Sequence, residues 1–230
     1  MDLYTTAGSL LGVSLLQSLT AINTDDPSIA RKNSVGGTVC IIAFFHYLLM
    51  IWTGTGRSNI RYADWFITLP LLFVECILLC GIDTSDNLAS IIICVTLLVL
   101  MLIFGKIARG RKSCFILAFA CLVVFTILFY NIIPESASTN GIVSLSVVGT
   151  WFLYGLAEWY GSERTLNSLD TVNKALFGLF VALSSWRVRW WYYVCVCVKF
   201  RDEDSFCYSR TLSRQFHSRQ LSSIVCTNCI

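Results

Sequence analysis

The sequence has little charge and little proline: of its 230 residues, 13% are charged and three are proline. A soluble domain usually carries charge on about a quarter of its residues, so this composition argues against one. Hydrophobic residues instead reach 56% of the chain, and the mean hydropathy is +0.68. The composition therefore predicts a polytopic helical membrane protein.

A disulfide framework and a metal centre are not expected, although the chain has 11 cysteines. The C-terminal pair Cys226 and Cys229 has no second pair and no histidine pair at metal-ligand spacing. The net charge is only +3 and the basic residues are spread over loops and the tail, so no nucleic-acid partner is expected. Six cysteines lie inside apolar runs and are interpreted as small buried hydrophobes: Cys40, Cys76, Cys80, Cys94, Cys114 and Cys121.

Apolar runs near the length that a helix needs to cross the hydrocarbon core alternate with short polar connections. No Lys or Arg precedes the first run, so we interpret it as a membrane helix rather than a signal peptide. We predict an all-α membrane protein with a seven-transmembrane helix bundle over residues 1–186, followed by an interfacial or disordered tail over 187–230. The predicted helices are Leu3–Ile22, Val35–Trp52, Asn59–Leu79, Leu88–Ile107, Ser113–Ile133, Ile142–Tyr160 and Leu166–Trp186.

Ionisable side chains inside two predicted helices indicate function, because charge is costly within a bilayer. Asp64 and Glu75 are eleven positions apart, which places them on one helix face about 16 Å apart, with Thr68 between them. A charge cluster that only pins two helices together would not require Glu75. A buried lysine has a clearer purpose if it forms a Schiff base with a carbonyl cofactor. The residues concerned are Arg61, Asp64 and Glu75 in the third helix and Asp170 and Lys174 in the seventh.

Two motifs resemble those of the microbial (type 1) rhodopsins. Residues 61–72 read R-Y-A-D-W-F-I-T-L-P-L-L, similar to the family's R-Y-x-D-W-x-x-T-x-P-L-L. Residues 170–178 read D-T-V-N-K-A-L-F-G, similar to the D-x-x-N-K-x-x-F-G run of proteorhodopsins. The resemblance extends over about Leu3 to Trp186.

The resemblance implies a set of roles for these residues. All-trans retinal would be bound to Lys174 through a Schiff base, with Asp64 as primary counterion and proton acceptor and Asp170 as second counterion. Arg61 would stabilise the two carboxylates. Glu75 would be the proton donor, waiting protonated in apolar surroundings, and Asp64, Thr68 and Glu75 together match proteorhodopsin-like proton pumps. The matched pocket positions are Trp65, Leu69, Leu72, Trp151 and Tyr154.

A light-driven outward proton pump is therefore the expected function, with the N-terminus outside. Its partners would be protons, the lipid bilayer and other copies of the chain, as a trimer or pentamer. A light-gated ion channel or a photosensory rhodopsin is the alternative, although a sensor has no need of the donor Glu75. No enzyme activity is expected, because the sequence offers no nucleophile and base pair or metal-ligand set.

Several further positions carry details of this interpretation. His46 falls where proteorhodopsins place a histidine that bonds the counterion, and the alternative is a core histidine bonded to a backbone carbonyl. Gly155 replaces the usual proline of the sixth helix, and Glu158 replaces an aromatic beside the retinal ring. Leu72 is associated with green rather than blue absorption, and Glu163 resembles a proton-release glutamate but lies in a short turn.

Overall fold

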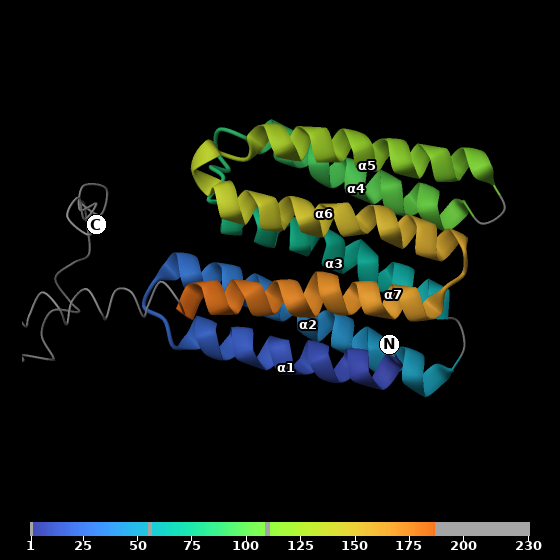
Figure 1. Ribbon diagram of the computed structural model, residues 1–230, viewed down its shortest axis with the longest axis horizontal. Coiled ribbons are helices and arrows are strands. Elements are labelled where there is room, and N and C mark those ends of the chain that lie inside the picture. Colours follow the sequence, from blue (N-terminus) through green and yellow to red (C-terminus); the bar gives the residue numbers. More distant parts are fainter. Residues whose placement is uncertain (1, 55–56, 109–110, 187–230) are drawn as a thin grey trace, which may run out of the picture. The chain divides into compact units, whose positions relative to one another are not determined.

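The fold is a bundle of seven helices (Figure 1), as the apolar runs predict. The computed structural model describes residues 2–54, 57–108 and 111–186, and these ranges contain no strand. Helices α1 to α6 are each long and apolar enough to cross a membrane, so the chain is an integral, multi-pass membrane protein. Their bounds are Leu3–Ile22, Pro27–Thr53, Arg57–Cys80, Leu88–Ile107, Lys112–Ile132 and Ser138–Trp159.

The second helix begins earlier than its apolar run indicates. We predicted a start at Val35, but α2 begins at Pro27, where the Asp26 side chain accepts hydrogen bonds from the first backbone N–H groups. A proline at the first helical position and an aspartate cap favour a helix start. The extra turns are polar, so hydrophobicity alone does not detect them.

The seventh helix changes its geometry along its length. It opens as α7 (Glu163–Asp170), continues through a π-helical turn (Thr171–Leu176) and ends as α-helix over residues 177–186. A π-helical turn leaves a backbone carbonyl without its ordinary α-helical partner, and such turns occur mostly at functional sites. Lys174 lies inside this one.

The seventh helix packs between other helices of the bundle. It contacts α1, α2 and α6, and Figure 1 shows it running between them. Helices α4 and α5 pack against each other and bury little of their surface, since apolar side chains such as Ile92 and Ile116 are exposed. In a membrane protein such a face meets lipid, so the polar interior is confined to α1, α2, α3, α6 and α7.

Candidate functional site

Lys174 is the centre of the polar interior. Only 1% of its surface is exposed, and the other lysines that the structure describes are not buried. Its backbone carbonyl, inside the π-helical turn, accepts a hydrogen bond from the Cys40 thiol at 3.5 Å. The amine therefore enters the bundle from a locally widened helix whose shape a neighbouring side chain supports.

Two carboxylates face this amine. The Nζ atom of Lys174 donates to Oδ2 of Asp64 and lies 3.3 Å from Oδ1 of Asp170. Both aspartates are buried. The lysine and the two carboxylates stabilise one another in the low-dielectric interior. Removal of any one of them would leave a buried charge uncompensated, at a large cost in free energy.

Asp170 is held by hydrogen-bond donors on both of its oxygens. Tyr47 donates to Oδ2 at 2.7 Å, and Tyr154 donates to Oδ1 at 2.8 Å. The indole Nε1 of Trp65 lies 3.4 Å from Oδ1 as well. These donors come from α2, α6 and α3, so Asp170 is fixed in place by three helices around it.

Arg61 adds a cation on the far side of Asp170. Its Nη1 lies 3.5 Å from Oδ2 of Asp170, and its Nη2 donates to the Asn167 side chain at 3.0 Å. The guanidinium is buried, and its planar fork is suited to hold several acceptors at once. The cluster thus contains two cations and two carboxylates, with Asp170 between Arg61 and Lys174.

Asp64 is less completely satisfied than Asp170. Its Oδ1 is buried and has no hydrogen-bond partner among the described residues. The Nδ1 atom of His46 lies 3.7 Å from this oxygen but 2.9 Å from the Ile42 carbonyl, so the histidine forms its hydrogen bond within its own helix. The hydroxyl of Thr68 donates a hydrogen bond to the backbone carbonyl of Asp64 at 3.0 Å.

Glu75 lies apart from this cluster, near the other end of α3. Its side chain is buried, with 1% exposed, and it accepts a hydrogen bond from the Gln17 amide at 3.1 Å. No cation contacts it within the described ranges. A buried carboxyl group beside a neutral amide favours the uncharged acid, because nothing compensates a charge there.

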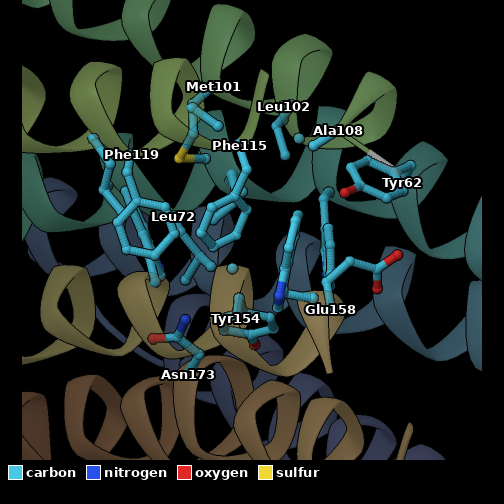
Figure 2. A pocket seen from close by; sticks show the side chains of 18 of the residues that line it. Tyr62, Leu72, Met101, Leu102, Ala108, Phe115, Phe119, Tyr154, Glu158 and Asn173 are labelled. Carbon is cyan, nitrogen blue, oxygen red and sulfur yellow. The ribbon is translucent and has the colours of Figure 1, made fainter. Parts of the chain in front are cut away.

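An apolar cavity of about 490 Å³ opens beside Lys174. Figure 2 shows Met101, Phe115 and Phe119 on the side of α4 and α5, across from Tyr154 and Asn173. The mostly aromatic and aliphatic lining suits an apolar ligand, and Lys174 supplies the one basic group of the lining. All the residues that sequence matching assigned to a pocket line this cavity: Trp65, Leu69, Leu72, Trp151, Tyr154 and Lys174.

The two unusual residues of α6 also line the cavity. A side chain at Gly155 would come within 2.7 Å of the Phe119 ring, so glycine lets that ring lie against the helix. Glu158 lies at the same end of the view as Tyr62 and Ala108 (Figure 2). The cavity lining therefore includes a carboxyl group in addition to the amine of Lys174 and the amide of Asn173.

The sequence analysis named the charged residues of the site but missed the side chains that bind them. Tyr47 and Asn167 bind the charge cluster, and Gln17 binds Glu75, yet none belongs to a quoted motif. Their signal in the sequence is weak, since each is a single polar residue in or beside an apolar run. The lining residues from α4 and α5 include no polar side chain, and Gly105 is the one glycine that interrupts them.

The remaining sequence predictions concern Glu163, a metal centre and the C-terminal tail. Glu163 is in the first turn of α7 and is exposed. No group of metal-ligating side chains occurs in the part of the chain that the structure describes. The predicted tail, residues 187–230, lies outside the described residues.

Comparison with known proteins agrees with the motifs. The sequence model of bacteriorhodopsin-like proteins matches residues 3–188. A blue-light absorbing proteorhodopsin from Gamma-proteobacterium Hot 75m4 is 30% identical over 194 residues, covering 70% of this chain and 76% of the relative. A green-light absorbing proteorhodopsin from Gamma-proteobacterium EBAC31A08 is 29% identical over 179 residues, covering 64% and 71%. The crystal structure of thermophilic rhodopsin from Rubrobacter xylanophilus superposes with a TM-score of 0.69 at 23% identity, over 80% of this chain and 93% of that one.

Proposed function

The chain belongs to the bacteriorhodopsin-like protein family, and we propose that it is a light-driven outward proton pump that carries all-trans retinal on Lys174. Membership of this family implies a retinal chromophore. The covalent site, the isomer and the direction of transport belong to the proposal. The observation that carries it is the unequal environment of three buried carboxyl groups along one path: Asp170, Asp64 and Glu75.

The cavity supports retinal as the ligand. Lys174 is the one buried lysine that the structure describes, and it borders an apolar space bounded by Trp65, Trp151 and Tyr154. When bound there through a Schiff base, retinal would supply light absorption and a light-driven change of shape that lowers the proton affinity of the lysine nitrogen. The aromatic walls hold such a ligand in one orientation and exclude water from it.

Asp64 is the best acceptor for a proton released at Nζ of Lys174. Its Oδ2 is the nearest carboxylate oxygen to this nitrogen, and its Oδ1 has no hydrogen-bond partner in the described ranges. Asp170 is instead bound by Tyr47 and Tyr154 and lies beside Arg61, all of which favour its charged form. Transfer to Asp64 therefore costs less than transfer to Asp170.

Glu75 is suited to return a proton to Lys174 from the other direction. It lies about 16 Å along the axis of α3 from Asp64, and its neutral surroundings hold the proton until the lysine nitrogen needs it. Asp64 lies nearer the start of α3 and Glu75 nearer its end. A proton that leaves Lys174 for Asp64 and is replaced from Glu75 therefore moves in one direction along the helix. With the N-terminus outside, that direction is outward.

Substitution of the donor tests this role. In Glu75→Gln the return of dark-state absorbance after a flash should slow by about 100-fold or more, because general acid catalysis contributes about that much. A small diffusible weak acid should restore the rate. The matched control is Glu135→Gln, which removes an exposed carboxylate between α5 and α6 and should recover like the wild type.

Two results would contradict the proposal. An unchanged recovery in Glu75→Gln would remove Glu75 from the donor role. A light-induced current that reverses with the applied voltage, in place of a proton current of fixed direction, would identify a light-gated channel. Each of these results would contradict the proposal whatever the recovery rate of the Glu135→Gln control.

A further inference from the structure

Gln17, on the first helix, is the side chain that binds the carboxyl group of Glu75. Its Nε2 donates to Oε1 of Glu75 at 3.1 Å, and this is the one hydrogen bond to that carboxyl group in the described part of the chain. The glutamine has no exposed surface. A primary amide is costly to bury unless it is hydrogen-bonded, so its presence deep in α1 calls for a partner such as Glu75.

Two glycines provide the space in which this pair meets. A Cβ atom at Gly36 on α2 would overlap both the Glu75 carboxyl group and the Gln17 amide. A Cβ atom at Gly178 on the seventh helix would lie 2.9 Å from Oε1 of Gln17 and 3.0 Å from Val13. Gly36 of α2 and Gly178 of the seventh helix therefore leave space for the Gln17 amide of α1 to reach the Glu75 carboxyl group of α3.

The amide can bind Glu75 in either protonation state. Its N–H group donates to the carboxylate, as it does in the structure. Its Oε1 is buried and has no hydrogen-bond partner among the described residues. A protonated carboxyl group has an O–H donor, and a primary amide offers a donor and an acceptor side by side. Protonated Glu75 can therefore give its O–H to Oε1 while still accepting from Nε2.

Polar groups of α2 lie along the same side of the bundle. Asn33, Gly36 and Cys40 follow one another at helical spacing, so they share a face. Asn33 donates to Ser185 at 3.0 Å at one end, and Cys40 bonds to the carbonyl of Lys174 at the other. Gly36 lies between them and has no side chain, so Glu75 is bound by Gln17 of α1 and not by α2.

We propose that Gln17 is a positioning residue for the proton donor, holding the Glu75 carboxyl group through both of its protonation states. The inference rests on the proposed function of Glu75 as donor. Without the amide, the carboxyl group would be free to rotate toward another partner, and it would spend less time in the geometry from which it transfers its proton.

Light-minus-dark infrared spectroscopy and flash kinetics together test this inference. The substitution is Gln17→Met, which keeps a long apolar stem of similar size and removes the amide. The C=O stretch of protonated Glu75, identified by its absence in Glu75→Gln, should move to higher wavenumber because the carbonyl loses its N–H donor. Recovery of dark-state absorbance should slow by about tenfold, the effect of losing one hydrogen bond to an ionisable group, and its pH profile should shift.

A pair of neighbouring glycines supplies a second test and its matched control. Gly36→Ala inserts a methyl group between the amide and the carboxyl group and should change the same infrared band and slow recovery. Gly37→Ala should change neither. Its methyl group would lie 3.3 Å from the hydroxyl of exposed Ser18 and at ordinary contact distance from the Ser14 carbonyl (3.5 Å) and the Cβ atom of Gln17 (3.6 Å), and the Gln17 amide is not among these nearest atoms. Both variants are compared at equal retained visible absorbance.

The outcomes separate this inference from the proposed function. If Glu75→Gln is slow while Gln17→Met keeps the wild-type band, rate and pH profile, Gln17 does not position the donor and the pump mechanism stands. If Glu75→Gln recovers like the wild type, the donor role fails and the inference fails with it. A shifted band with slow recovery in Gln17→Met and Gly36→Ala, but not in Gly37→Ala, supports the inference.

Discussion

Neutralising Asp170 should strongly destabilise the bundle. The substitution Asp170→Asn keeps the shape of the side chain but removes the charge that lies 3.3 Å from Lys174 and 3.5 Å from Arg61. All three side chains are buried. Two buried cations would then share one buried carboxylate, Asp64.

The expected size of the effect follows from this burial. Removing one partner of a buried ion pair costs about 3–5 kcal/mol, because the remaining charge is left uncompensated. The two tyrosines donate to different oxygens of Asp170. The oxygen of the asparagine can still accept from one tyrosine, and its NH2 group can donate to the hydroxyl oxygen of the other, so we expect the lower end, about 3 kcal/mol. For a chain of this size that corresponds to a fall in Tm of roughly 6–12 °C.

Thermal unfolding in lipid nanodiscs measures this prediction. Loss of helical circular dichroism is followed on heating, with and without retinal, so that folding is separated from pigment formation. The matched control is Asp25→Asn, an exposed aspartate between α1 and α2 whose loss should change stability by less than about 0.5 kcal/mol. A Tm for Asp170→Asn within a degree of the control would refute the claim that Asp170 balances the two buried cations.

Two further substitutions test the cavity. Lys174→Ala should give a folded protein with no visible absorption band after retinal is added, because the amine that would form the Schiff base is gone; a coloured variant would remove Lys174 from that role. Gly155→Ala should lower stability by about 1–3 kcal/mol through overlap with Phe119, and Phe119→Leu in the same chain should restore part of the loss; equal stability of Gly155→Ala and wild type would show that the ring moves freely.

The charge cluster could be predicted from the sequence because membrane burial and helical spacing act on it together. Asp170 and Lys174 are four residues apart, and Arg61 and Asp64 are three apart, so each pair shares a helix face. Charged residues in apolar helices must face the interior. These two constraints place all four side chains in one region, and the structure brings them into contact.

The partners of the cluster could not be predicted in the same way. Tyr47 reaches Asp170 and Gln17 reaches Glu75 only because of how α2 and α1 rotate about their axes. That rotation depends on close packing at small residues such as Gly36, which the sequence contains without naming the helix that approaches it. The π-helical turn at Lys174 has no distinct sequence pattern either.

Light-induced pH change in an unbuffered suspension of cells that express the protein with added retinal tests the central claim most directly. The account predicts acidification of the medium on illumination, abolished by a protonophore and by Lys174→Ala, and much reduced in Glu75→Gln under continuous light. Coloured cells whose medium does not acidify on illumination would contradict it.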